Sequence, residues 1–271
     1  MSHHLPLPAS QALVLPRGFH DTELEYLRAM LVTASPIGSV KLLVDQSSSM
    51  GDLMGSVLEL MAANVRDLRN VRGMARRTFA SIMYFADGVE IVVPPTRVVN
   101  LAAPLHYNPG GLTALIAVTA DAIEETLSFM DVIRAYCEAR GFVVPELRCA
   151  ICVMTDGADT VPSSLSRRPE LLRLSAKAIW RGVTLSGIAI GKDPTELEEL
   201  LGFPKGSFQA VAGTPEGVWV ASQATSSTMT TTILGCPPVP VQPAPISPTG
   251  TVHGQVVSVD NVPTGPFPRK V

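Results

Sequence analysis

The feature that most constrains the fold is a regular alternation between short apolar segments and longer segments with helical periodicity. The apolar segments have the length of β-strands, and the longer ones repeat apolar residues every three to four positions. Strands alternating with helices form a doubly wound α/β sheet, mostly parallel, with helices on both faces. The predicted strands are 40–44, 78–85, 89–93, 148–155, 183–190 and 207–212, and the predicted helices are 51–69, 113–139, 167–181, 194–202 and 215–234.

One pair of strands departs from this alternation. Only Asp87-Gly88 and its neighbours separate the predicted strands 78–85 and 89–93, and this dipeptide favours a tight turn between antiparallel strands. The sheet is therefore predicted to carry one antiparallel hairpin at its edge.

Three regions differ in composition. Residues 1–37 form an N-terminal extension that begins rich in proline and ends in a predicted amphipathic helix, 21–34, capped by Asp21. Residues 38–235 contain the alternating strands and helices and form the predicted domain. Prolines recur from residue 236 to 271, which favours polyproline II and is compatible with a docking tail or with a linker without specific contacts.

Composition argues against several classes of protein. The chain has 271 residues, 46% of them hydrophobic, which is enough for one substantial core. Its net charge of −3 and pI near 6.0 argue against general affinity for nucleic acid, which needs a basic surface. No apolar run reaches the roughly 18 residues of a membrane span, and the N-terminus lacks the features of a signal peptide. We therefore expect a cytoplasmic protein.

The cysteines fit that compartment. Cys149 and Cys152 form a C-x-x-C motif, but it lies inside the predicted strand 148–155. A zinc site would need a second pair of Cys or His ligands, and no such pair is evident in the sequence. The two thiols are therefore predicted to be reduced and to pack as small apolar groups.

The segment Asp45-Gln46-Ser47-Ser48-Ser49 follows the first predicted strand. In an extended chain alternate residues point the same way, so the carboxylate and the hydroxyls of Ser47 and Ser49 should converge at the carboxyl end of the strand. Open α/β sheets bind ligands there. Gln46 and Ser48 should point away and shape the loop. One carboxylate with two hydroxyls suits Mg²⁺, Mn²⁺ or Ca²⁺.

Two later segments supply further oxygen ligands. Thr113 follows the Gly-rich loop 108–111, and Asp156 lies in a T-D-G turn after a buried strand. Taken together, the three motifs resemble the metal-ion-dependent adhesion site (MIDAS) of the von Willebrand factor A (vWA) family, with the intracellular bacterial members nearest. The resemblance covers about residues 38 to 235. It implies that a Mg²⁺ ion is held by Asp45, Ser47, Ser49, Thr113 and Asp156.

The resemblance also implies a function. A protein partner would supply an Asp or Glu to the open position of the ion, so the chain would be an adaptor and not an enzyme. One alternative is a vWA subunit of an AAA+ ATPase machine, whose ATPase must be another chain because no P-loop motif occurs here. The other is a haloacid-dehalogenase-type phosphatase with Asp45 as nucleophile. That enzyme needs an acid at position 47, which is serine, and a later lysine, for which Lys177 or Lys192 would have to serve.

Three further residues lie close to these motifs in the sequence. His106 precedes the second loop, Asp52 follows the first, and Asp159 follows the third. Each could approach the metal ligands, but all three are predicted to be loop residues that face solvent.

Overall fold

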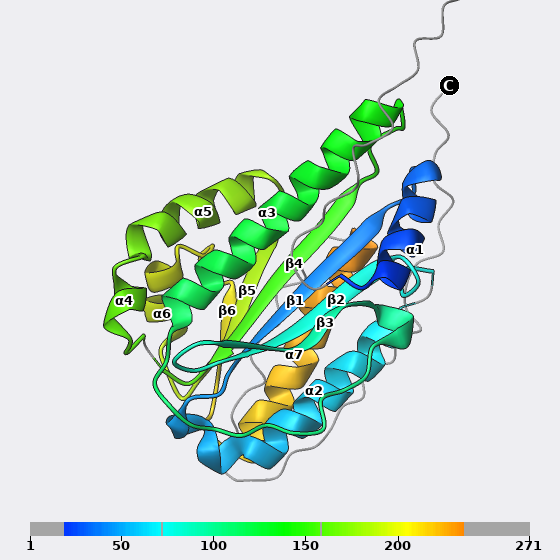
Figure 1. Cartoon of the computed structure of the whole chain (residues 1–271). Helices are drawn as coiled ribbons and strands as arrows, with labels where there is room; N and C mark the ends of the chain where they lie inside the picture. The colour runs from blue at the N-terminus through cyan, green and yellow to red at the C-terminus, as the bar shows by residue number, and fades with distance from the viewer. Residues whose placement is uncertain (1–18, 72, 158, 236–271) are drawn as a thin grey trace, which may run out of the picture. The chain divides into compact units, whose positions relative to one another are not determined.

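The computed structural model describes residues 19–71, 73–157 and 159–235 (Figure 1). Its strands form one sheet in the order β3-β2-β1-β4-β5-β6. β3 is antiparallel to β2, and all other neighbours are parallel. The predicted α/β sheet with one antiparallel edge hairpin is confirmed. The strands are β1 (Ile37–Asp45), β2 (Thr78–Phe85), β3 (Val89–Arg97), β4 (Leu147–Thr155), β5 (Thr184–Ile190) and β6 (Phe208–Val211).

Helices cover both faces of the sheet, as Figure 1 shows. In β1, Leu42 and Val44 point into the core beneath α2 and α7, whereas Leu43 points into the core beneath α3, α5 and α6. Burial on both faces explains why this strand reads as an apolar run. The helices are α1 (Asp21–Val32), α2 (Met54–Arg69), α3 (Leu115–Arg140), α4 (Pro162–Leu165), α5 (Arg168–Trp180), α6 (Pro194–Leu201) and α7 (Pro215–Leu234), with 3-10 helices η1 (Ser48–Leu53) and η2 (Val98–Asn100).

α1 packs through Leu27 and Leu31 into a third core cluster that includes Phe79 of β2 and Phe129 of α3. The predicted cap is wrong: His20 occupies the N-cap position without a side-chain hydrogen bond, and Asp21 is the first helical residue. Glu23 of the same turn is buried because its Oε2 accepts a hydrogen bond of 2.8 Å from Nε of Arg97 in β3. A tertiary ion pair therefore anchors the start of this helix.

Other differences from the predicted elements are local. β3 continues past residue 93 through Pro94-Pro95 to Arg97, with a register shift at the prolines. An edge strand tolerates them because its outer N–H groups have no ladder to join. The predicted helix 51–69 begins instead with η1, and α4 was not predicted because four residues show no periodicity. None of the helices in the described part of the chain could span a membrane. The predictions for 1–18 and 236–271 fall outside the described residues.

Candidate metal centre

The candidate site lies where the connections of the sheet diverge. β1 and β4 are neighbours, but β1 continues through α2 to β2 on one side, and β4 continues through α4 and α5 to β5 on the other. The space outside the carboxyl ends of two such strands is the usual ligand site of an open α/β sheet. Asp45 is the last residue of β1 and Thr155 the last of β4, so both strands end at this point.

Hydrogen bonds join four of the five predicted ligands into one chain. Asp45 is fully buried, and its Oδ1 accepts a bond of 2.8 Å from the backbone N–H of Ser47. The hydroxyls of Ser47 and Ser49 lie 3.1 Å apart, and the Ser49 hydroxyl donates to Oδ1 of Asp156 at 2.9 Å. Ser49 is exposed and Asp156 partly so. The chain thus runs from the core to the surface.

The residues converge as predicted, but the alternation of side chains along an extended chain is not the cause. Ser47 is the N-cap of η1, and Ser49 lies within that 3-10 helix. The three side chains therefore meet because the chain turns after Asp45, and not because it continues as a strand. The bond from the Ser47 amide to the Asp45 carboxylate is the local interaction that starts the turn.

The loop after β1 (residues 46–49, the first loop) is hydrogen-bonded to the Gly-rich loop that carries Thr113 (residues 108–113, the second loop). The segment after β4, residues 156–160, is the third loop. The carbonyl of Gln46 accepts a bond of 2.7 Å from the N–H of Gly110. The N–H and the hydroxyl of Ser48 both donate to the carbonyl of Gly111, at 3.2 and 3.1 Å. Ser48 therefore has the predicted loop-shaping role, which extends to the loop that carries Thr113.

Thr113 joins the second loop to the third. Its N–H donates to the hydroxyl of Thr160, and the N–H of Thr160 donates back to the Thr113 carbonyl, both at 2.9 Å. A Cβ built on Gly157 would lie 3.8 Å from the Thr113 hydroxyl oxygen. The buried Thr113 side chain therefore faces the turn that directly follows Asp156.

Two groups that hold Asp45 were not predicted. The Thr155 hydroxyl donates to Oδ2 of Asp45 at 2.5 Å and accepts from the N–H of Gly157 at 3.1 Å. The buried hydroxyl of Tyr107 donates to the backbone carbonyl of Asp45. Thr155 stood within the T-D-G motif, and its place at the strand end could have identified it. No local sequence motif could have identified Tyr107, because its partner is 62 residues away in sequence.

Asp87 was predicted only as a turn residue, yet it organises the Gly-rich loop. Its Oδ1 accepts a bond of 2.6 Å from the N–H of Leu112. Gly111 has a φ of +80°, and a Cβ there would lie 2.8 Å from Oδ2 of Asp87. Glycine is needed at position 111 both for this conformation and for the close approach of the carboxylate.

The site has a surplus of negative charge. Burial raises the pKa of Asp45, hydrogen bonds from Thr155 and Ser47 oppose that rise, and the nearby charge of Asp156 adds to it. Burial, with the charges of Asp45 and Asp156, also raises the pKa of Tyr107. Among the described residues, no ion pair involves Asp45 or Asp156. A bound cation would relieve this repulsion.

The donor set fits a hard divalent ion. Two carboxylates and three hydroxyls present only oxygen atoms, as Mg²⁺ and Ca²⁺ prefer. Nowhere in residues 19–71, 73–157 and 159–235 do three or more His, Cys, Asp or Glu side chains gather to hold a metal. The residues that would hold the ion are Asp45, Ser47, Ser49, Thr113 and Asp156.

The C-x-x-C motif does not form a metal site. Cys149 points into the core beneath α3 and α5, whereas Cys152 points into the core beneath α2 and α7. Residues three apart in a strand face opposite sides of the sheet, so the two thiols cannot share an ion. Burial raises the pKa of Cys149 to about 12 and that of Cys152 to about 11. The prediction that both thiols pack in the core is confirmed, and neither forms a disulfide among the described residues.

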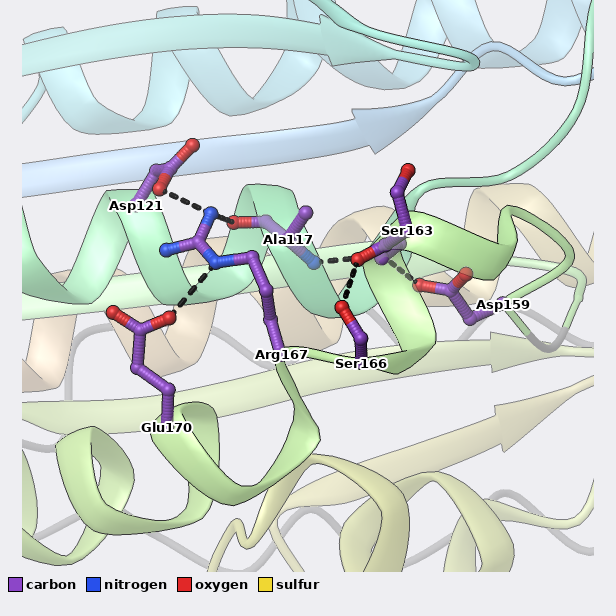
Figure 2. Close-up of polar contacts among 8 residues, drawn as sticks. Ala117, Asp121, Asp159, Ser163, Ser166, Arg167 and Glu170 are labelled. Carbon is purple, nitrogen blue, oxygen red and sulfur yellow. Dashed lines mark hydrogen bonds and ion pairs between the residues drawn. The ribbon is translucent and has the colours of Figure 1, made fainter.

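Two of the three neighbouring residues face solvent as predicted, although Asp52 lies in η1 and not in a loop. Asp52 is exposed, and His106 is an exposed loop residue whose Nε2 lies 4.0 Å from Oε1 of Glu90. The prediction for Asp159 is wrong, because this residue is only 8% exposed. Its carboxylate accepts a hydrogen bond from the N–H of Ile116 at the start of α3, and Figure 2 shows its position beside that helix.

Comparison with known proteins shows similarity at the level of fold. No family model and no curated protein matches the chain. The pilus adhesin SpaC from Lactobacillus rhamnosus GG is 12% identical over 73% of this chain and 30% of its own, with a TM-score of 0.52. Proximal thread matrix protein 1 of the mussel byssus is 19% identical over 71% and 47%, with a TM-score of 0.49. The SpRpn10 VWA domain is 14% identical over 67% and 92%, with a TM-score of 0.44.

The chain spans less than half of the adhesin and of the mussel protein. The likeness to the adhesin is one of fold. The sheet order, with its antiparallel edge strand, is the doubly wound α/β arrangement that was predicted from the sequence.

Proposed function

We propose that this protein is a metal-dependent protein–protein interaction module in which a Mg²⁺ ion binds an acidic residue of a partner. The observation that carries the proposal is the hydrogen-bonded chain from the buried Asp45 through Ser47 and Ser49 to Asp156 at the surface. It ends at the point where the connections of β1 and β4 diverge. The oxygen atoms, the negative charge and the opening to solvent all suit a hard cation.

Each residue has a part in this proposal. Asp45 and Asp156 supply the negative charge, and the hydroxyls of Ser47, Ser49 and Thr113 supply neutral oxygen ligands. Two carboxylates at most neutralise a divalent ion, so a further carboxylate from a partner is not repelled by an excess of negative ligands. When bound, the ion supplies a coordination position for that carboxylate. Thr155 orients Asp45 through its hydroxyl.

The surroundings of Asp45 support a binding role over a nucleophilic one. The side chain is fully buried, and both of its oxygens already accept hydrogen bonds, from the amide of Ser47 and the hydroxyl of Thr155. A phosphatase of the type considered above needs an acid at position 47, where a serine binds Ser49 instead. We therefore propose that the site holds and releases a partner without chemical turnover.

Metal binding is tested by thermal unfolding with and without Mg²⁺. A ligand that binds only the folded state should stabilise it by about 2.7 kcal/mol at a hundredfold excess over Kd. Asp45→Asn keeps the shape of the side chain but loses its charge, and should remove most of this gain. Asp52→Asn changes an exposed carboxylate after the same loop and should keep it. Equal stabilisation of the wild type and Asp45→Asn by Mg²⁺ would rule out the proposed site.

Partner binding is tested by capture from the native cell extract on the immobilised protein. A partner held through one ion should be released by EDTA and should respond little to moderate salt, which screens only surface charges. Thr113→Ala should weaken capture, and Asp156→Ala should weaken it more because it also removes charge. An AAA+ ATPase in the EDTA eluate would make the chain the vWA subunit of such a machine. A complex that resists EDTA would contradict the metal-mediated contact.

A further inference from the structure

The first turn of α3 is capped by residues from another loop. Its own N-cap residue, Ala114, provides no side-chain hydrogen bond. Instead, the N–H of Ile116 donates to Oδ2 of Asp159 at 2.7 Å, and the N–H of Ala117 donates to the hydroxyl of Ser164 at 2.9 Å. Figure 2 shows Asp159 facing the start of this helix. Two of the free N–H groups in the first turn of α3 are thus satisfied by the segment that follows β4.

Asp159 gathers three donors on one carboxylate. Besides the Ile116 amide, Oδ2 accepts the hydroxyl of Ser164, and Oδ1 accepts the N–H of Val161 at 3.1 Å. The side chain is only 8% exposed. A buried carboxylate is stable here because charge-assisted hydrogen bonds and the positive end of the helix dipole compensate its charge. Asparagine could not replace it fully, since its NH₂ group would face a donor.

The two sides of this cap, the start of α3 and Asp159, are each close in sequence to a candidate metal ligand. Thr113 lies two residues before α3, and Asp156 lies three residues before Asp159 in the third loop. The next residue, Thr160, forms two hydrogen bonds with the backbone of Thr113, one to its N–H and one to its carbonyl. The placement of Thr113 relative to Asp156 therefore depends on how firmly residues 159 and 160 are held.

Figure 2 also shows the contacts of Arg167, which join α3 to the start of α5. Arg167 donates from Nη1 to Oδ1 of Asp121 in α3 at 2.7 Å, and from Nε to Oε2 of Glu170 in α5 at 2.9 Å. These groups are partly exposed, so the ion pairs contribute little to stability. The carboxylate of Asp159, in contrast, is buried and bonds directly to the first turn of α3.

We infer that Asp159 is a positioning residue for the metal centre: by capping α3 it sets the distance between Thr113 and Asp156, without touching the ion itself. The inference rests on the proposed function in so far as those two residues bind Mg²⁺. Residues that orient the ligands of a metal typically change its affinity by 10- to 100-fold when removed.

The first test compares two helix caps. Asp159→Ala should raise the Kd for Mg²⁺, measured by titration calorimetry on the full chain, about tenfold. The matched control is Asp193→Ala, which removes the carboxylate that caps α6 through the N–H of Thr195 at 2.8 Å. It should leave the Kd unchanged, because α6 carries no candidate ligand. A wild-type Kd in Asp159→Ala would overturn the inference.

The second test uses the metal-free protein and is independent of Mg²⁺ binding. Amide hydrogen exchange at Thr113 should be faster in Asp159→Ala than in the wild type, although its acceptor, Thr160, is unchanged. Ser164→Ala, which loses one bond only, should act more weakly and serves if Asp159→Ala does not fold. Unchanged exchange at Thr113 in the folded variant would overturn the inference. If the wild type binds no Mg²⁺, the proposed function fails and this measurement alone decides the coupling of the loops.

Discussion

Two buried charges on β1 have opposite surroundings. Lys41 and Asp45 are four residues apart on the same strand, so their side chains point toward the same face of the sheet. Lys41 donates to Oε2 of Glu125 in α3 and forms an ion pair there. The carboxylate of Asp45 accepts hydrogen bonds from the Thr155 hydroxyl and the Ser47 amide, and the charge that acts on its pKa is the negative one of Asp156.

The difference separates a charge that the fold pairs with an opposite charge from one that it leaves without a counter-charge. A buried charge is unfavourable unless it is paired or fully hydrogen-bonded. The fold itself supplies the counter-charge of Lys41, so that pair is complete without a ligand. Asp45 stands at the carboxyl edge of the sheet, and the described residues provide it with no cation. This charge at the edge of the sheet is the one on which the proposed metal site rests.

The largest expected effect comes from breaking the complete pair. Glu125→Ala leaves Lys41 buried without a counter-charge and should lower the free energy of unfolding by about 2 kcal/mol. This is less than for a fully buried pair, because the Glu125 side chain is 31% exposed. Urea denaturation measures the loss. The Mg²⁺-dependent gain should stay as in the wild type, and its disappearance would show that the two regions are not independent.

A double variant checks the interpretation of that loss. Replacing both partners, as Lys41→Met with Glu125→Leu, removes both charges and fills the same space with apolar groups. Stability should then return close to that of the wild type. A double variant as unstable as Glu125→Ala would mean that the single substitution had damaged packing rather than stranded a charge.

A smaller effect is expected from the hydroxyl that holds Asp45. Thr155→Val is close in shape but leaves Oδ2 of Asp45 without its 2.5 Å hydrogen bond. Hydrogen bonds to charged groups contribute about 1.5–3 kcal/mol, and the metal-free protein should lose about 1.5 kcal/mol. The pKa of Asp45 should rise further. Thr155→Ser retains the hydroxyl and should remain close to the wild type in the same denaturation experiment.

The smallest expected effect is the pH dependence of stability in EDTA. Burial raises the pKa of Asp45 above its ordinary 3.8, so the folded state binds this proton more tightly than the unfolded chain. The associated stability is fully present below pH 3.8 and is lost as pH rises through the raised pKa. Asp45→Asn lacks this loss. Glu146 and Glu170, whose pKa values are lowered by arginines, act in the opposite direction.

The informative quantity is therefore the stability of the wild type minus that of Asp45→Asn at each pH, which cancels the other carboxylates. This difference should fall with rising pH above 3.8. Saturating Mg²⁺ should oppose the fall, because the cation competes with the proton for the site. A difference that rises with pH would contradict the proposed environment of Asp45.

Most of the fold could be predicted because its elements have strong local signals. β2 begins at Thr78 and ends at Phe85 as predicted, since a run buried on both faces is bounded by charged and turn residues. The predicted strand 89–93 ended too early, before the prolines of β3. Prolines are tolerated in this strand because it lies at the edge of the sheet, which the sequence does not reveal. The candidate ligands were identified because each stands directly after a strand or a Gly-rich turn, where parallel strands bring loops together.

The supporting residues of the site could not be predicted in the same way. Tyr107 binds Asp45 across 62 residues of sequence, and Asp159 binds Ile116 across 43. A tyrosine in a loop and an aspartate near a turn have no pattern that distinguishes a buried partner from a solvated side chain. Their roles follow only from the elements that are packed against them.

The sequence by itself determined the alternation of strands and helices, the antiparallel turn at Asp87-Gly88 and the oxygen-rich ends of β1 and β4, because these depend on the order of neighbouring residues. Only the tertiary structure decided which charges are balanced: Lys41 by Glu125, Glu23 by Arg97, and Asp45 by no cation among the described residues. The physical reason is that burial and counter-charge are properties of three-dimensional packing. A carboxylate at a strand end acquires an unbalanced charge only when the surrounding loops exclude water from it.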